Sequence, residues 1–137
     1  MIRHYKEGDL SKINLQDEQL KEGQSEWYMF KHPDTIVFED GDKVLAIIRP
    51  CYEAGGRLFL GALISKDCGY KSISMFKKIK SIIDDWLYFG DVQRIEFTTQ
   101  SNFKQANRLA ELLGFQKEGT LRRYYNGMDF NIWGRIE

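Results

Sequence analysis

The sequence predicts an α/β fold of the α+β type, in which about four helices accompany a mixed, mostly antiparallel sheet of about seven strands. Three observations lead to this prediction. Short β-branched runs separated by turn residues fill much of the first half, one long stretch of helical period follows, and an Asn-Gly turn joins two strand-like runs near the end. Strand and helix patterns alternate along the chain, which is typical of a mixed sheet.

Length and composition predict one folded domain over residues 1–137. Of the 137 residues, 42% are apolar and 14% aromatic, enough for one hydrophobic core. Twenty basic residues balance 20 acidic ones, and this zero net charge argues against a nucleic-acid or membrane-surface partner. The two cysteines cannot form a four-cysteine zinc site and neither lies in a CxxC motif, and the two histidines do not have HExxH spacing, so no metal is expected. Without a signal peptide or an apolar run of ~20 residues, a cytoplasmic protein is expected.

The first third of the chain predicts a strand and two helices. Residues 2–5 form the strand, and Asp9 is placed to cap a helix whose apolar side carries Leu10, Ile13 and Leu20. A second short helix is expected around 25–30, where Pro33 follows and prevents its continuation.

A three-strand meander is predicted next. The runs 35–40 and 43–50 flank a Gly-Asp turn, and the run 57–65 follows a Gly-Gly break. A long helix is then expected over 71–89, because seven apolar residues recur at spacings typical of one helix face: Met75, Phe76, Ile79, Ile82, Ile83, Trp86 and Leu87. The strand 92–99 comes after it. A strand–helix–strand crossover is right-handed, so 57–65 and 92–99 should be parallel.

The last third predicts a helix and a hairpin. The helix covers 100–115, with Ser101 or Asn102 as its N-cap and Gly114 as its C-cap. Asn126–Gly127 is a strong hairpin signal between the final two strands.

One motif in this last third is specific. A strand leads to an Asn, then to a helix that ends in Leu113–Gly114–Phe115, then to a strand that contains Glu118–Gly119–Thr120–Leu121–Arg122, and then to the hairpin. This stretch, together with the element order of the whole chain, resembles the GNAT superfamily of acetyl-CoA-dependent N-acetyltransferases. Within that superfamily it is similar to the branch of ribosomal-protein and small-substrate acetyltransferases.

The resemblance implies that acetyl-CoA is the cosubstrate. The family's Q/R-x-x-G-x-G/A loop falls on Lys66–Lys71, with its first glycine kept and Lys71 in place of the last small residue. Lys71 would either clash with the pyrophosphate of coenzyme A or add a charged contact. Backbone donors at the start of the long helix would bind that pyrophosphate, and they belong to Cys68, Gly69, Tyr70, Lys71 and Ser72.

The resemblance also implies a site for the pantetheine arm. Gly61 would mark a bulge that splays the central parallel pair of strands, and the alternative is a glycine packed beneath a large side chain. The arm would then bond to the backbone of Leu63, Ile64 and Ser65. Asn102 is expected to bond pantetheine, or else to serve only as the helix cap.

Acetyl transfer needs a base for the amine and an acid for the departing thiolate. Glu96 is the preferred base, and the alternative is an ion pair with Arg94 or a lysine. The family's tyrosine acid falls on Ala110, so Tyr124 is the expected acid, with cross-strand packing as its alternative. Covalent catalysis by Cys68 is disfavoured. The acceptor cleft is expected to include Trp27, Tyr28 and His32.

Two functions from different classes follow. The first is direct transfer of an acetyl group from acetyl-CoA to an unidentified primary amine, carried by a small molecule or a protein. The alternative is a catalytically inactive GNAT-fold protein with a binding or structural role, such as a phage virion or accessory protein. It is favoured if Lys71 fills the pyrophosphate pocket. The exposed edge of the final hairpin also predicts pairing with a second copy, as a homodimer.

Overall fold

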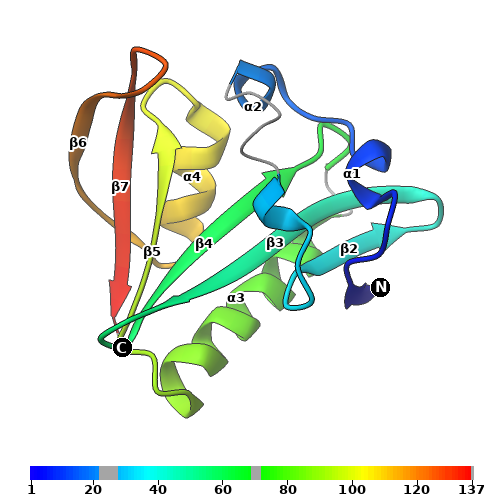
Figure 1. Ribbon diagram of the computed structural model, residues 1–137, viewed down its shortest axis with the longest axis horizontal. Coiled ribbons are helices and arrows are strands. Elements are labelled where there is room, and N and C mark those ends of the chain that lie inside the picture. Colours follow the sequence, from blue (N-terminus) through cyan, green and yellow to red (C-terminus); the bar gives the residue numbers. More distant parts are fainter. Residues whose placement is uncertain (22–27, 69–71, 137) are drawn as a thin grey trace. The chain divides into compact units, whose positions relative to one another are not determined.

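The computed structural model describes residues 1–21, 28–68 and 72–136. Within them it has seven strands and four helices, in the predicted order (Figure 1). The strands are β1 (Ile2–His4), β2 (Ile36–Asp40), β3 (Lys43–Glu53), β4 (Arg57–Ile64), β5 (Arg94–Gln100), β6 (Gln116–Tyr125) and β7 (Met128–Ile136). The helices are α1 (Asp9–Lys12), α2 (Asp17–Lys21), α3 (Ile73–Phe89) and α4 (Lys104–Leu112).

The strands form one mixed sheet with the order β1-β2-β3-β4-β5-β7-β6. β4 and β5 are parallel, as predicted from the crossover between them. The pairs β1–β2, β2–β3, β5–β7 and β6–β7 are antiparallel. The predicted mixed, mostly antiparallel sheet is therefore confirmed.

By internal contacts the chain divides into two compact units. The first unit comprises Met1–Cys51 and Leu60–Met75, and the second comprises Tyr52–Phe59 and Phe76–Glu137. The boundary crosses β4, whose first three residues pair with β5 in the second unit and whose last five belong to the first unit. The predicted splay of this strand pair stays a prediction.

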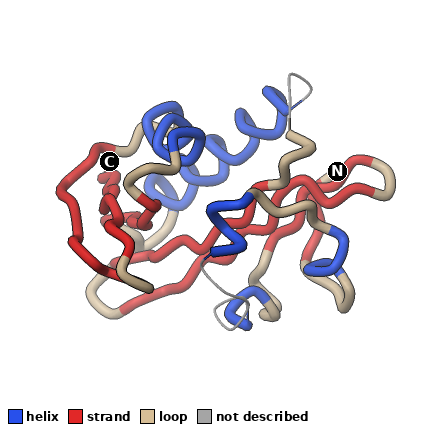
Figure 2. The backbone as a smooth tube through the Cα atoms, turned by 90° about the horizontal axis from the view of Figure 1, so that it is seen from above, coloured by secondary structure: helices blue, strands red, loops and turns tan. Residues whose placement is uncertain are grey.

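The first unit has an apolar core under the β2–β3 hairpin. Its buried members come from the N-terminal segment and three strands: Ile13, Leu15, Phe30, Val37, Val44, Ile47 and Leu63. The N-terminus lies beside the hairpin, where the ammonium group of Met1 donates to the carbonyl of Glu39 at 2.9 Å (Figure 2). β1 is thereby held along β2.

The single helix predicted from Leu10 is wrong, because the chain forms two short helices there. Between α1 and α2, Ile13 makes a parallel bridge to Val44 and Leu15 an antiparallel bridge to Ser65. Both residues are buried, so an alternating pattern of period two prevails over the helical period in this segment. As a result Leu20, expected on the buried side, is 52% exposed.

Asp9 is also not the N-cap that the sequence predicts, since Gly8 occupies that position. The carboxylate of Asp9 is fully buried and makes a bidentate pair with Arg3, with both N···O distances at 2.8 Å. It accepts the backbone N–H of Lys6 as well, at 2.8 Å. The side chain therefore fastens β1 to α1. Of the short helix expected at 25–30, residues 28–30 form one 3₁₀ turn, and 25–27 lie outside the described residues.

In the second unit β5, β7 and β6 lie side by side, and α4 lies against β5 (Figure 1). β5 pairs with β7 over seven residues, from Arg94↔Ile136 to Gln100↔Phe130. The β6–β7 hairpin turns at Asn126 and Gly127 with φ of 50° and 72°, the left-handed pair that an Asn-Gly turn is suited to adopt. The hairpin predicted from that dipeptide is confirmed.

The predicted caps of α4 are half right. Gly114 takes the left-handed conformation just after the helix, with φ 87°. At the other end the N-cap is Phe103 and no side chain caps the helix. Ser101 lies two residues before that position, and its hydroxyl donates to the side chain of Asn131 at 3.1 Å.

Candidate functional site

The connection from β4 to α3 is built by Ser65. Its hydroxyl accepts the N–H of Asp67 at 2.9 Å, and its carbonyl accepts the N–H of Cys68 at 3.3 Å. Ser65 and Ser72 are 1% and 2% exposed, so both ends of this connection are fixed within the first unit. The predicted pyrophosphate ligands Gly69, Tyr70 and Lys71 lie outside the described residues.

The start of α3 is electrostatically suited to an anion. The helix has 17 residues, and its first turn contains no acidic side chain. The free N–H groups and the positive end of the helix dipole favour negative charge there. The described residues on either side of the loop thus fit the pyrophosphate of coenzyme A.

Backbone groups of β4 and Ser65 that were predicted to hold pantetheine, or that adjoin them, carry hydrogen bonds already. The N–H of Ser65 donates to Leu45 on β3 at 2.9 Å, whereas the carbonyl of Ile64 accepts Nε2 of Gln16 at 3.1 Å. A second side-chain amide, Nε2 of Gln19, donates to the carbonyl of Ala62 at 3.3 Å. Leu63 points its side chain into the core and is 2% exposed.

Gln16 and Gln19 are residues that the sequence reasoning missed. Both are nearly buried, at 9% and 5% exposure, and Oε1 of Gln19 has no hydrogen-bond partner in the part of the chain that the structure describes. A signal was present in the sequence, since Gln16 comes three residues after Ile13 and four before Leu20. This spacing places the amide of Gln16 on the apolar side of the predicted helix.

Gly61 fits the packing alternative. A Cβ atom at this position would lie 2.6 Å from Cε of Met29 and 3.3 Å from Cζ of Phe30. The glycine therefore makes room for two side chains of the turn at 28–30 within the first unit.

Cys68 has the environment of an inert thiol. Burial raises the pKa of the Cys68 thiol, and hydrogen bonds that involve Ser72 and Ser65 only partly oppose this. The thiol donates to the carbonyl of Leu45 at 3.4 Å. A protonated, hydrogen-bonded thiol is a poor nucleophile, in keeping with the expectation of direct transfer.

Glu96 of β5 lies among arginines in the second unit. Its Oε1 is 3.5 Å from Nε of Arg94 and 3.5 Å from Nη1 of Arg57, and its side chain is 16% exposed. These contacts correspond to the ion-pair alternative, and the role of base stays a prediction.

Arg94 has its shortest contacts with Glu118 of β6. The two groups form a bidentate ion pair with N···O distances of 2.6 and 2.8 Å. The hydrogen bonds from Arg94 lower the pKa of Glu118, with partial burial acting against them. Gly134 lies directly beneath, since a Cβ there would come within 2.5 Å of both partners.

Asn102 is exposed, and a different asparagine organises the end of β5. Oδ1 of Asn107 accepts the hydroxyl of Thr99 at 2.6 Å and Nδ2 of Asn131 at 3.1 Å. Nδ2 of Asn107 donates to the carbonyl of Ser101 at 3.0 Å. The network holds the β5–α4 turn, and its sequence signal was an Asn inside a helix, three residues before the buried Ala110.

The remaining predicted residues have separate environments. Tyr124 is 54% exposed and packs on Phe130 with ring centroids 5.5 Å apart, which is the packing alternative. Tyr28 is 78% exposed. Nδ1 of His32 accepts the backbone N–H of Asp34 at 3.0 Å. Trp27 lies outside the described residues.

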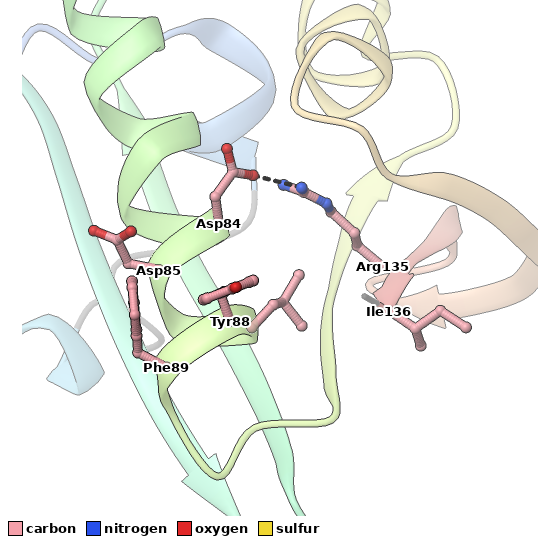
Figure 3. Close-up of a pocket in the computed structure, with 7 residues that line it drawn as sticks. Asp84, Asp85, Tyr88, Phe89, Arg135 and Ile136 are labelled. Carbon is pink, nitrogen blue, oxygen red and sulfur yellow. Dashed lines mark hydrogen bonds and ion pairs between the residues drawn. The ribbon is translucent and has the colours of Figure 1, made fainter.

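The second unit has a surface pocket whose lining includes none of the predicted site residues (Figure 3). It has a volume of about 280 Å³ and is lined by Asp84, Asp85, Leu87, Tyr88, Phe89, Arg135 and Ile136. Arg135 crosses it to pair with Asp84 at 2.5 Å. Its other Nη group donates to the carbonyl of Leu113 at the end of α4, so this arginine joins three elements.

In the described part of the chain, no cluster of three or more His, Cys, Asp or Glu side chains is arranged to hold a metal ion. Among the described helices, none combines the length and apolarity that a membrane crossing demands.

Solved structures with a similar fold are GNAT acetyltransferases. An acetyltransferase of the GNAT family from Bacillus anthracis matches with a TM-score of 0.75 over 98% of this chain and 93% of its own, at 13% identity. The ribosomal-protein-S5-alanine acetyltransferase from Vibrio fischeri matches with a TM-score of 0.65 over 98% and 91%, at 16% identity. RimL, a ribosomal alpha-N-protein acetyltransferase in complex with coenzyme A, matches with a TM-score of 0.63 over 74% and 60%, at 17% identity. No protein-family model and no curated protein sequence matches. The chain therefore has the GNAT fold, as its sequence predicts.

Proposed function

We propose that this protein is an acetyl-CoA-dependent N-acetyltransferase that transfers the acetyl group directly to a primary amine. The observation that carries the proposal is the connection from β4 to α3. There a turn built by Ser65 leads to a helix of 17 residues without an acidic side chain in its first turn. In a GNAT fold this is the place for the pyrophosphate of the cofactor, and one matched structure was solved with coenzyme A.

The described residues fit such a cofactor in two respects. The helix start favours the pyrophosphate. Oε1 of Gln19 is a buried acceptor without a partner in the described residues, and Nε2 of the same side chain donates to the carbonyl of Ala62 on β4. A pantetheine arm carries amide N–H groups that suit such an acceptor. The proposed pyrophosphate ligands are Cys68, Gly69, Tyr70, Lys71 and Ser72. The proposed pantetheine ligands are Leu63, Ile64, Ser65 and Asn102.

The cosubstrate would supply a thioester: the amine nitrogen bonds to the acetyl carbon, the carbon–sulfur bond breaks, nitrogen loses a proton and sulfur gains one. The residues of this chain would orient the amine and move those protons. Both arginine contacts of Glu96 are made through Oε1. Glu96 is proposed to accept the amine proton. Tyr124, half exposed on β6, is proposed to protonate the thiolate. Much of the rate would come from orientation alone.

Thermal unfolding with and without acetyl-CoA tests the proposal. At one hundred times its dissociation constant a ligand stabilises the folded state by about 2.7 kcal/mol. For a domain of this size the expected rise in Tm is on the order of 5–10 °C. Gly69→Pro removes a backbone N–H in the loop that would hold the pyrophosphate, so it should abolish the rise. The Tm of this variant without ligand is its own baseline. An unchanged Tm at millimolar acetyl-CoA would refute the proposal.

The second candidate function is a GNAT-fold protein that binds without catalysis. It is favoured by Ala110, which is fully buried where the family's tyrosine acid falls, and by the packing of Tyr124 on Phe130. A thiol assay for released coenzyme A, run over a panel of primary amines, separates the two. Binding of acetyl-CoA with no amine-dependent release of thiol would support the second candidate.

A further inference from the structure

Two glutamine side chains of the first unit follow one edge of β4. Nε2 of Gln16 donates to the carbonyl of Ile64 at 3.1 Å, and Nε2 of Gln19 donates to the carbonyl of Ala62 at 3.3 Å. Carbonyls two residues apart lie on the same edge of a strand. The N–H of Ser65 bonds to β3, and successive residues of a strand direct their backbone groups to alternate edges. The carbonyls of Ile64 and Ala62 therefore lie on the edge opposite to β3. The two amides therefore follow the edge that faces away from β3.

Backbone contacts hold the glutamines in this position. Leu15 forms an antiparallel bridge with Ser65, and the N–H of Lys66 donates to the carbonyl of Asn14 at 2.8 Å. The segment from Asn14 onward thus runs antiparallel to the end of β4. Both side chains are nearly buried, with Gln16 at 9% exposure and Gln19 at 5%.

The two amides differ in one respect. Oε1 of Gln19 is buried and has no partner in the described chain, whereas no atom of Gln16 is in that condition. A buried acceptor without a donor costs free energy, because water solvated it in the unfolded chain. The donor that would satisfy Gln19 has to come from outside the described residues.

We propose that Gln19 is a positioning residue for the pantetheine arm of coenzyme A, whose amide N–H it accepts at Oε1. The inference rests on the proposed function, since it needs coenzyme A beside β4. Pantetheine contains two secondary amides, each with one N–H donor. The carbonyls of Ala62 and Ile64 on this edge already accept the two glutamine amides, so the unpaired Oε1 of Gln19 is the acceptor that remains for such a donor. Gln19 keeps Nε2 on Ala62 and presents this oxygen to the ligand.

Calorimetry with two probes tests the assignment in the full chain. The probes are coenzyme A and its nucleotide half, 3′-phosphoadenosine 5′-diphosphate, which lacks the pantetheine amides. Gln19→Met keeps the side-chain length and removes the acceptor. It should weaken coenzyme A binding roughly tenfold, the worth of one hydrogen bond, and leave the affinity for the nucleotide half unchanged. Its unliganded Tm should stay within about 2 °C of the parent. The substitution loses the hydrogen bond to Ala62, but it also removes a buried acceptor that has no partner, and the two effects oppose each other.

Gln16→Met is the matched control, since it removes the bond to Ile64 but no orphaned acceptor. Its coenzyme A affinity should change by less than about threefold. Gln19→Asn withdraws the amide by one methylene and should weaken coenzyme A in the same selective way, which keeps the test decisive if Gln19→Met does not fold.

Three results would overturn the assignment. Equal or tighter binding of coenzyme A by Gln19→Met would mean that the amide merely covers the strand edge. Equal loss of both probes would mean general damage to the fold. Failure of the unmodified protein to bind coenzyme A would refute the proposed function as well, whereas binding by the parent with an unaffected variant refutes only the role of Gln19.

Discussion

At the scale of single residues, Gly61 shows how closely the first unit is packed. Gly61→Ala would place a methyl group 2.6 Å from Cε of Met29, with Phe30 close behind it. The end of the flexible methionine can move aside, whereas the ring of Phe30 at 3.3 Å must also give by a few tenths of an ångström, so the overpacking should cost about 1 kcal/mol. We therefore expect the free energy of unfolding in urea to fall by about that amount.

Met29→Ala provides the partner for a double-mutant cycle. With the methionine shortened, the added methyl group has space, so the cost of Gly61→Ala should drop below about 0.5 kcal/mol. An equal cost in both backgrounds would show that backbone effects, and not contact with Met29, make glycine necessary.

Cys68 yields a prediction about reactivity. Since burial raises the pKa of its thiol above the ordinary value of 9.0, the rate of alkylation at Cys68 should still be rising as the pH passes 9.0. Cys68→Ala should keep acetyl transfer within about threefold of the parent rate, because direct transfer needs no enzyme nucleophile. Mass spectrometry of the parent protein after incubation with acetyl-CoA tests for a covalent intermediate. An acetylated Cys68 that turns over would contradict direct transfer.

At the scale of elements, the β6–β7 hairpin depends on the ion pair above Gly134. Gly134→Ala puts a methyl group within 2.5 Å of Arg94 and Glu118, which must separate or rotate away. The ion pair is partly exposed and therefore contributes at most about 1 kcal/mol, so the loss in urea stability should be of that size. The remaining dependence of stability on salt should also be weaker than in the parent.

Gly119→Ala is the control on the neighbouring strand. The nearest atom to its added Cβ would be Cγ2 of Ile132 at 3.9 Å, an ordinary contact. This variant should be as stable as the parent or slightly more so, since alanine has less conformational freedom to lose on folding. Equal destabilisation by both substitutions would show that the ion pair is not the reason for glycine at 134.

The elements themselves were largely predictable, because each depends on local pattern. The helical period of α3, the Asn-Gly turn and the left-handed Gly114 are properties of a few adjacent residues. The segment between α1 and α2 was not predictable in this way. Ile13 and Leu15 take extended backbone because Val44 and Ser65 pair with them across the sheet. Such tertiary pairing leaves no trace in the helical spacing of the segment.

The candidate site was less predictable than the fold, for a related reason. A motif can point to a loop, and the cofactor role of the loop before α3 is predicted in that way. The polar atoms beside it come from a distant segment, since Gln16 and Gln19 reach β4 only once the first unit has folded. Asn107, Thr99 and Asn131 likewise form hydrogen bonds although each belongs to a different element. Polar side chains on expected apolar faces were the only sequence signal for these contacts.

At the scale of the whole molecule, three carboxylates shape the response of stability to acid. The pKa values of Asp9, Asp84 and Glu118 are all lowered in the folded chain. Asp84 and Glu118 have side chains that are 42% and 41% exposed, so solvent screens their ion pairs and they contribute little. Asp9 is fully buried, and for it burial opposes the lowered pKa while Arg3 and the N–H of Lys6 outweigh that effect.

The acid response of the first unit should therefore depend on Asp9. Because its folded-state pKa lies below the unfolded value near 3.8, its stabilisation is fully present above about pH 5 and is lost as the pH falls through the folded-state pKa. Asp9→Asn leaves Arg3 with Glu39 as its other carboxylate partner, at 3.0 Å, so the loss at pH 7 should be about 2–3 kcal/mol.

Urea titrations from pH 7 to pH 2 measure this contribution. The difference between parent and Asp9→Asn should be largest at neutral pH and shrink toward pH 2, since protonation removes in the parent the charge that the variant already lacks. Asp34→Asn is the control, because the side chain of Asp34 is 54% exposed and its carboxylate has a long contact with His32, at 3.8 Å. The stability curve of this variant should follow that of the parent throughout. A constant gap between parent and Asp9→Asn over the whole range would assign the loss to packing, and would show that the charge of Asp9 does not hold β1 to the first helix.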